Sequence, residues 1–278
     1  MPGHDAPPPP FPGPTAQRAR SPIADAFAAR VGSAALMPYL MGGFPTLKLS
    51  RDIGLACADA GADLLELGVP YSDPLADGPV IHEAGTRALA AGATLAGVLD
   101  VARALSPRVP VVLMCYTNLV LASGAQVFAQ RLAEVDTAGL IVPDLPLEEA
   151  PEVLSACDEA GIDLVPLVAP TTPPQRLAAI GGRARGFLYT VSVVGTTGER
   201  ATLSDRFAEV VRRARAATNV PVALGFGIST PEHVRQAADA GADGVIVGTR
   251  LVREAAEASD PARAVGSLVR TLGNALTG

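Results

Sequence analysis

Two carboxylates stand out in the stretch 58–79, which reads ADAGADLLELGVPYSDPLADGP. Glu66 lies inside a short apolar run, and Asp77 follows in a loop rich in Pro, Gly and Asp. A strand interior is a costly place for a charge, because desolvation disfavours the ionised form. We expect Glu66 either to pair with a Lys or Arg, or to serve as a general acid or base. Asp77 precedes a glycine, so capping of a turn is the alternative to a chemical role.

Glycine-containing segments follow three of the later apolar runs, and they suggest a second kind of chemistry. They read VGTTG at 194–198, LGFGIS at 224–229 and VGT at 247–249. Glycine lets backbone N–H groups approach an anion closely, and a helix that starts near Thr249 would add the positive end of its dipole. Turns also need glycine, so one such segment alone would be weak support. Three in succession favour a phosphate site.

The elements that must position these residues repeat along the chain: a short apolar run, a loop, then an amphipathic segment of helix length. An internal repeat supports this reading, because ADAGADLLELG at 58–68 returns as ADAGADGVIVG at 238–248 and, more loosely, as DEAGIDLVPLV at 158–168. Each copy predicts a helix that ends in a left-handed glycine and a strand two residues later. The eight predicted strands are Ala35–Met41, Leu64–Gly68, Val111–Cys115, Gly139–Val142, Leu164–Val168, Phe187–Val191, Pro221–Leu224 and Gly244–Val247.

The predicted strands are apolar on both faces, as parallel strands covered by helices should be. Eight β/α units favour a closed (β/α)8 barrel, also called a TIM barrel, as a single domain. An open sheet is the alternative, but no GxGxxG follows the first strand. Active sites of such barrels lie at the C-terminal ends of the strands. The polar residues expected there are Glu66, Asp77, Tyr116, Asn118, Asp144, Tyr189 and Ser192.

Residues 1–22 form a separate zone, because their prolines oppose helix and sheet. We predict a disordered Pro-rich extension over 1–22 and the barrel domain over 23–278, beginning with a short helix from Ile23 to Val31. A docking role for the extension is the alternative.

Composition excludes several classes of function. The net charge is −6 and the pI is near 5.1, which argues against a nucleic-acid partner. Cys57, Cys115 and Cys157 have no CxxC spacing and are expected to be buried thiols in a reducing compartment. The three histidines lie far apart, so we expect no metal site. No apolar stretch approaches the roughly 18 residues of a membrane helix, and a cytoplasmic location is the simplest expectation.

The residues alone therefore predict a barrel with a phosphate site and an acid/base carboxylate across its mouth. That combination is typical of a lyase or isomerase acting on a sugar-phosphate-like substrate.

The sequence also resembles a known family, the alpha subunit of tryptophan synthase, over about residues 23–275. The segments that carry the resemblance are LELGVPYSDPLADGP at 65–79, YTN at 116–118, VPDLP at 142–146 and GFGIS at 225–229. The resemblance implies cleavage of indole-3-glycerol phosphate to indole and glyceraldehyde 3-phosphate. It implies Glu66 as the acid/base, Asp77 as the carboxylate at the indole N–H, and Tyr189 beside them. The implied phosphate contacts are Gly198, Gly227, Gly248 and Thr249, and the implied lining of the indole pocket is Tyr39, Met114 and Phe226.

The resemblance further implies a partner. In the family a beta subunit carries pyridoxal phosphate and condenses indole with serine, in an α2β2 assembly, whereas the alpha subunit needs no cofactor. Pro74 and Pro146 match positions near that interface.

Three segments depart from the family pattern: GTTGER at 195–200, Asp136-Thr137-Ala138 before the fourth strand, and MGGFP at 41–45 after the first. The first lies in a loop that closes the family's active site, so two alternatives stay open. One is a stand-alone indole-3-glycerol phosphate lyase of the same family. The other is a catalytically silent barrel that acts as the allosteric partner of a pyridoxal phosphate enzyme, although the presence of both carboxylates argues against it.

Overall fold

The computed structural model describes residues 21–191, 203–225 and 227–277, where nine parallel strands alternate with twelve helices. The strands are β1 (Ala35–Met41), β2 (Leu65–Gly68), β3 (Val111–Met114), β4 (Gly139–Ile141), β5 (Asp163–Val165), β6 (Leu167–Val168), β7 (Leu188–Val191), β8 (Val222–Gly225) and β9 (Gly244–Val247). The helices are α1 (Pro22–Ala28), α2 (Leu47–Asp59), α3 (Pro79–Ala90), α4 (Leu95–Leu105), α5 (Thr117–Ser123), α6 (Ala125–Ala133), α7 (Pro151–Ala160), α8 (Pro174–Gly181), α9 (Leu203–Arg215), α10 (Pro231–Asp239), α11 (Thr249–Glu257) and α12 (Pro261–Asn274).

The strands form a closed ring. Their order is β5-β4-β3-β2-β1-β9-β8-β7-β6, and the two end strands are contiguous in sequence, separated only by Pro166. Proline has no N–H to donate, so the predicted strand Leu164–Val168 is present as two segments. Pro166 still accepts a hydrogen bond from the N–H of Tyr189 (3.1 Å), which joins the fifth strand position to β7. The eight predicted strands are thus all present, and the (β/α)8 barrel is confirmed.

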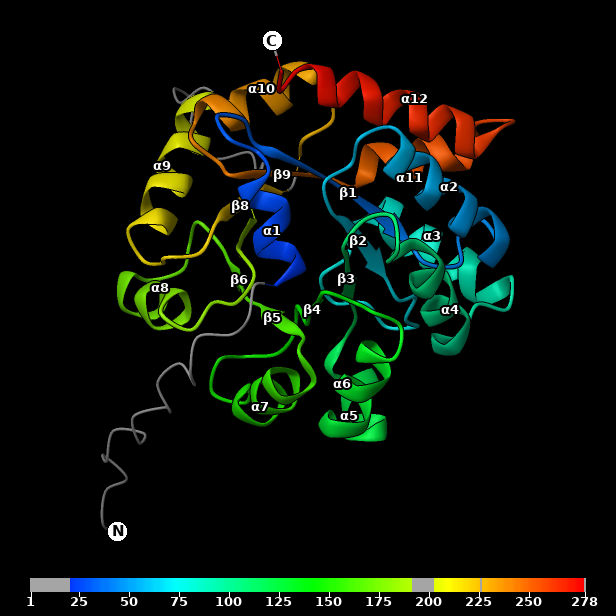
Figure 1. The fold of residues 1–278 in the computed structure, drawn as a ribbon, viewed down its shortest axis with the longest axis horizontal. Coiled ribbons are helices and arrows are strands. Elements are labelled where there is room, and N and C mark those ends of the chain that lie inside the picture. The colour runs from blue at the N-terminus through cyan, green and yellow to red at the C-terminus, as the bar shows by residue number, and fades with distance from the viewer. Residues whose placement is uncertain (1–20, 192–202, 226, 278) are drawn as a thin grey trace.

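Helices surround the ring because each strand has two apolar faces. All seven residues of β1 are buried, and the helices that follow the strands pack on their outer side (Figure 1). Neighbouring helices pack on one another as well, such as α2 with α12 and α6 with α7. In the described part of the chain no single helix is long and apolar enough to cross a membrane. The pair α3 and α4, bent by 107°, reaches that length and hydropathy only when taken together.

The N-terminal helix α1 closes the end of the barrel where the strands begin. Ile23 is fully buried, and its Cδ1 lies 2.8 Å from the place where a Cβ on Gly139, the first residue of β4, would stand. The Phe27 Cε1 lies 2.9 Å from the corresponding place on Gly244, the first residue of β9, and the Phe27 ring is 5.8 Å from that of Phe187. Glycines at these strand starts therefore give α1 the room to pack against the barrel.

The repeated turn has the predicted geometry. Gly61, Gly161 and Gly241 end their helices with φ of 95°, 83° and 87°, in the left-handed region that glycine adopts at low cost. The aspartate two residues later also has a structural role in two copies. Asp63 accepts a hydrogen bond from the N–H of Leu36 (2.8 Å), and Asp243 binds the equivalent group at the start of β8. The repeat thus ties each new strand to its neighbour.

A further helix-to-strand turn, between α6 and β4, is not one of the three copies and has no glycine at this position. Asp136, in the segment that departs from the family pattern, has φ of 54° and is exposed at the end of α6. A left-handed conformation costs an L-residue about 1–2 kcal/mol, and somewhat less for Asp. We expect Asp136→Gly to raise the free energy of unfolding by up to about 1 kcal/mol in urea denaturation. Glu134→Gly, at a right-handed position two residues earlier, should instead lower it by about 0.5–1 kcal/mol. A loss of stability in Asp136→Gly would contradict this account.

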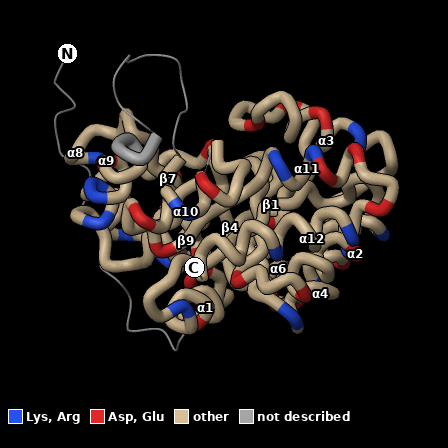
Figure 2. Tube along the Cα trace, turned by 90° about the horizontal axis from the view of Figure 1, so that it is seen from above, with Lys and Arg blue, Asp and Glu red and all other residues tan. Residues whose placement is uncertain are grey.

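Acidic and basic side chains are interspersed along the outer helices and loops (Figure 2). Several form ion pairs between neighbouring elements, such as Arg108 of the segment before β3 with Asp59 of α2. The absence of a nucleic-acid partner stays a prediction from the net charge of −6. The division into a disordered extension over 1–22 and a barrel domain stays a prediction. Its first twenty residues lie outside the described part, and Pro22 is the first residue of α1.

Candidate active site

The side chain of Glu66 points into the barrel. Glu66 stands opposite Tyr39 of β1 in the register of the sheet. Burial raises the pKa of Tyr189 on β7, and the charge of Glu66 raises it further. Because β2 and β7 are not neighbours in the ring, Glu66 and Tyr189 reach one another across the interior. A one-residue slip would have turned Glu66 outward.

The Glu66 carboxyl is fully buried and has no hydrogen-bond partner among the described residues for either oxygen. The alternative of an ion pair with Lys or Arg is therefore not found in the described part of the chain. Burial raises its pKa from 4.5 to about 8. A carboxyl with that pKa holds its proton near neutrality and can both give and take one, which suits a general acid/base.

Two tyrosines flank Glu66, and each lies over the last residue of the next strand. The Tyr39 hydroxyl is 2.2 Å from the place where a Cβ on Gly68 would stand. On the other side the Tyr189 hydroxyl lies 2.6 Å from the corresponding place on Gly225. Both side chains are buried, and burial raises both pKa values well above 10.0. The two glycines thus make the room that lets the rings close around Glu66.

This packing leads to a stability prediction. In Gly225→Ala the new methyl group would overlap the Tyr189 ring, which must move inside a filled barrel. We expect the free energy of unfolding to fall by about 1–3 kcal/mol in urea denaturation. The matched control is Gly85→Ala on α3, where the nearest atom is the flexible Met41 Cε at 3.4 Å. That variant should be slightly more stable than wild type, because alanine favours a helix. Equal stability of the two variants would contradict the tight packing.

Asp77 lies at the rim, in the loop between β2 and α3. The Tyr116 hydroxyl donates to its Oδ1 (2.9 Å) and accepts from the N–H of Ala76 (3.0 Å). Gly78 is the N-cap of α3 and has no side-chain cap, so Asp77 is not used for turn capping there. Burial raises the pKa of Asp77, while the Tyr116 hydrogen bond and the charge of His82 lower it. The carboxylate is therefore fixed in direction and half-buried at the mouth.

A network after β3 holds this loop, and its extent was not predicted. The Tyr116 ring stacks on Tyr71 with centroids 5.2 Å apart, and the Asn118 side-chain amide donates to the Tyr71 hydroxyl (2.7 Å). Asp144 accepts from both the N–H (2.8 Å) and the hydroxyl (2.9 Å) of Thr117. The signal in the sequence was only the placement of Tyr116, Asn118 and Asp144 at strand ends. The hydrogen bonds and ring contacts in the structure are needed to show which of these residues hold the loop that carries Asp77.

The candidate phosphate residues lie after β8 and β9. Gly227 is exposed and has φ of 74°, which favours glycine. Gly248 is the N-cap of α11 and makes no side-chain cap, and Thr249 begins that helix. Its first backbone N–H groups point toward the mouth end of the barrel, as an anion site requires. Gly198 and Phe226 lie outside the described residues, as does Ser192.

The remaining candidates fall into two groups. Met114 ends β3, is half-buried, and stands beside Gly68 in the sheet register, at the mouth. Cys57, Cys115 and Cys157 are buried, as predicted, and burial raises the pKa of Cys57 to about 12. Within the described residues no group of acidic, Cys and His side chains could hold a metal ion.

A closed parallel barrel with a buried proton-holding carboxyl at the C-terminal ends of its strands defines the class of (β/α)8-barrel enzymes. The model of the tryptophan synthase alpha chain family matches residues 26–275. This chain belongs to that family, and the alpha-subunit role in tryptophan biosynthesis follows from the membership.

Similar proteins agree with this assignment. The tryptophan synthase alpha chain of Prochlorococcus marinus (strain MIT 9313) is 50% identical over 230 residues, 82% of this chain and 84% of that one. The alpha chain of Synechococcus elongatus is 46% identical over 258 residues, 91% of this chain and 96% of that one.

Solved structures agree as well. A chain of Mycobacterium tuberculosis tryptophan synthase superposes with a TM-score of 0.85 at 36% identity, covering 93% of this chain and 99% of that one. A chain of the Pyrococcus furiosus tryptophan synthase a2b2 complex gives a TM-score of 0.81 at 35% identity, covering 87% and 99%. These solved structures have the same fold as this chain.

Proposed function

We propose that this chain cleaves indole-3-glycerol phosphate into indole and glyceraldehyde 3-phosphate, with Glu66 moving the protons. The observation that carries the proposal is the buried Glu66 carboxyl, whose pKa of about 8 lets it be protonated at neutral pH. The choice of substrate rests on membership of the family, and the mouth of the barrel would surround that substrate during the reaction.

A single carboxyl group can carry out both proton transfers of this reaction. Glu66 gives its proton to C3 of the indole ring, and the ring nitrogen becomes positively charged. The bond from C3 to the side chain then breaks, its electron pair neutralises the ring, and the side-chain hydroxyl becomes an aldehyde as Glu66 takes its proton. Each cycle returns Glu66 to its protonated form, so this subunit needs no cofactor for the step.

We assign to Asp77 the role of stabilising the positive charge that develops on the indole ring nitrogen. An oriented carboxylate stabilises such a charge at the place where it forms. Tyr116 positions Asp77 through its hydrogen bond, and Tyr189 packs beside Glu66. The phosphate is assigned to Gly227, Gly248 and Thr249, where the start of α11 favours an anion. Gly198 completes this group by the family resemblance.

The partner is a tryptophan synthase beta subunit that carries pyridoxal phosphate and accepts indole. The similar Pyrococcus furiosus chain comes from a tryptophan synthase a2b2 complex, which supports an α2β2 assembly for this chain. Pro74 lies in the same loop as Asp77, so a subunit docked there would contact the loop that holds a reacting group.

The test is indole release from indole-3-glycerol phosphate, measured with and without a candidate beta subunit. We expect wild type to release indole and to speed up with the partner, and Asp77→Asn to be roughly 100-fold slower in kcat. The control is Asp100→Asn on the outer helix α4, which should match wild type. No release from folded protein in any mixture would refute the proposal.

A second candidate is a stand-alone lyase of the same family. The departure GTTGER at 195–200 favours it, because that loop closes the family's site and responds to the partner. High turnover without any beta subunit, with no further rise on its addition, would support this second reading over the first.

A further inference from the structure

Glu66 gives up its proton partway through the proposed reaction, and the carboxylate then formed has no ready partner. The side chain is fully buried, and neither oxygen has a hydrogen-bond partner in the part of the chain that the structure describes. Burial is also what raises the pKa of this carboxyl to about 8. A buried carboxylate without a donor is costly. A donor that reaches Glu66 after the proton transfer would lower that cost.

The hydroxyl of Tyr39 is placed to be this donor. Tyr39 and Glu66 are paired in the register of the adjacent parallel strands β1 and β2 (Figure 1). Their backbones therefore lie about 4.8 Å apart, and their side chains share the inner face of the barrel. The Tyr39 hydroxyl stands over Gly68, two residues beyond Glu66 in the direction of the mouth. It lies on the side of Glu66 from which the substrate would come.

The ionisable groups that face Tyr39 are acids and other phenols. Burial first, then the charges of Asp77 and Glu66, and last that of Tyr116, raise the pKa of Tyr39 well above 10.0. Burial is likewise the first cause of the raised pKa of Tyr189, and the charges of Glu66 and Tyr39 follow. Tyr39 therefore keeps its proton near neutrality, within electrostatic reach of both carboxyls of the proposed mechanism.

Two phenols flank Glu66, and the order of the strands favours Tyr39 over Tyr189 as the donor. β1 is the neighbour of β2, whereas β7 lies across the ring. Tyr189 can approach Glu66 only through the interior that the substrate would enter. The approach of Tyr39 runs along the wall of the barrel, so it stays open when the interior is filled.

We propose that the Tyr39 hydroxyl donates a hydrogen bond to the Glu66 carboxylate once Glu66 has given its proton to C3 of the indole ring. This inference rests on the proposed function and adds a positioning residue to it. Tyr39 loses no proton. Its O–H bond stays intact while the carboxylate exists, and the hydrogen bond weakens when Glu66 takes the proton of the side-chain hydroxyl. A hydrogen bond to a charged group is the stronger kind, so the contact favours the intermediate over the resting state.

The direct test follows the titration of Glu66 by carbon-13 NMR of the full chain, labelled at the glutamate carboxyls. The Glu66 signal is the one missing from Glu66→Gln. Tyr39→Phe keeps the ring and removes the donor, so the midpoint of the Glu66 titration should rise by about one pH unit. The matched comparison is Tyr116→Phe, which removes a hydroxyl bound to Asp77 and should leave that midpoint in place. Circular dichroism checks that each variant is folded.

Indole release gives a second readout. Tyr39→Phe should lower kcat about tenfold and move the alkaline decline of kcat/KM to higher pH by about one unit. Tyr116→Phe should slow release without moving that decline. An unchanged Glu66 midpoint in folded Tyr39→Phe would overturn the inference, and a shift in Tyr189→Phe alone would overturn it in favour of Tyr189. If wild type releases no indole, the proposed function fails, while the NMR midpoint still decides whether Tyr39 reaches Glu66.

Discussion

Glu66→Gln should lower kcat for indole release by roughly 10²–10⁴-fold, the range typical of a lost general acid/base. Glutamine keeps the size and shape of the side chain, so the barrel stays packed, but its amide cannot carry the proton between C3 and the hydroxyl. The same reasoning fixes a pH dependence. The reaction starts from protonated Glu66, so kcat/KM of wild type should fall as pH rises through about 8, the pKa of that carboxyl.

The control for this experiment is Glu257→Gln, which removes an exposed carboxylate from α11 and should leave kcat unchanged. A folded Glu66→Gln variant with wild-type kcat would show that another group moves the proton. So would a wild-type profile without any decline around pH 8. Wild-type kcat in Glu66→Gln would exclude Glu66 as the acid/base. A flat pH profile would show that the reaction does not start from protonated Glu66.

Glu66 should also make the fold less stable as the pH rises. Its pKa is about 8 in the folded chain against an ordinary 4.5, so the folded state holds a proton that the unfolded state has released between these two values. The folded state then binds more protons, and the free energy of unfolding falls with pH across this window and levels off above it. The full effect is on the order of several kcal/mol, at 1.36 kcal/mol per pKa unit.

The measurement is urea denaturation of wild type and Glu66→Gln from pH 5 to 9. Near pH 5 the two should have similar stability, because the folded glutamic acid is neutral, as glutamine is. By pH 9 the variant should be the more stable of the two by several kcal/mol. The comparison cancels the titration of every other group, and Glu257→Gln should show little change at either end. A difference that does not vary with pH would show that Glu66 ionises normally in the folded chain.

The sequence predicted the barrel well because its signals are local. Apolar runs, the repeated AGAD turn and the left-handed glycine of each copy are all readable within about ten residues. Glu66 was identifiable because a carboxylate inside an apolar run is rare. The direction of the Glu66 side chain could not be predicted from the sequence. It follows from the order of the strands in the ring, which places Glu66 and Tyr189 across the barrel interior from one another.

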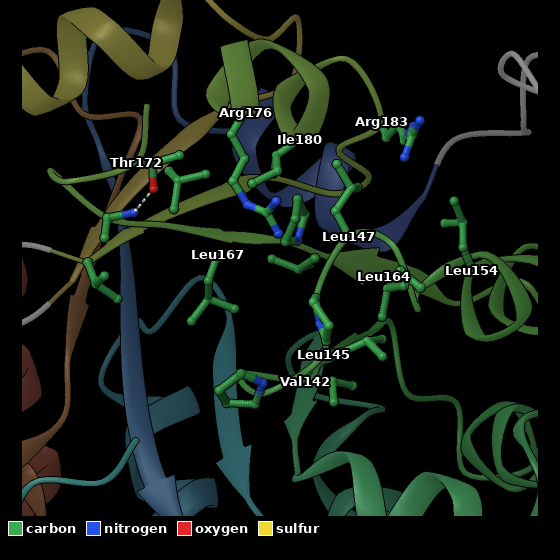
Figure 3. A pocket seen from close by; sticks show the side chains of 18 of the residues that line it. Val142, Leu145, Leu147, Leu154, Leu164, Leu167, Thr172, Arg176, Ile180 and Arg183 are labelled. Carbon is green, nitrogen blue, oxygen red and sulfur yellow. Dashed lines mark hydrogen bonds between the residues drawn. The ribbon is translucent and has the colours of Figure 1, made fainter. Parts of the chain in front are cut away.

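The features that sequence reasoning missed depend on contacts between distant segments. The hydrogen bond from Tyr116 to Asp77 joins residues 39 positions apart, and the sequence suggested only a rim position for Tyr116. Asp136 adopts the left-handed conformation at a helix-to-strand turn, where the three repeat copies have glycine. A cavity beside the mouth, between α7 and α8 (Figure 3), could not be predicted either, because its lining comes from elements far apart in the sequence.

The closure of one end of the barrel by α1 constrains the order of events in catalysis. With Ile23 and Phe27 packed against the strand starts, the described residues leave the strand-end mouth as the way in for the proposed substrate. A partner subunit seated on that face would share this single passage. The proposed substrate and its phosphate-bearing product would therefore pass in turn through the face at which the partner would dock. Turnover would then depend on access to that face as well as on proton transfer.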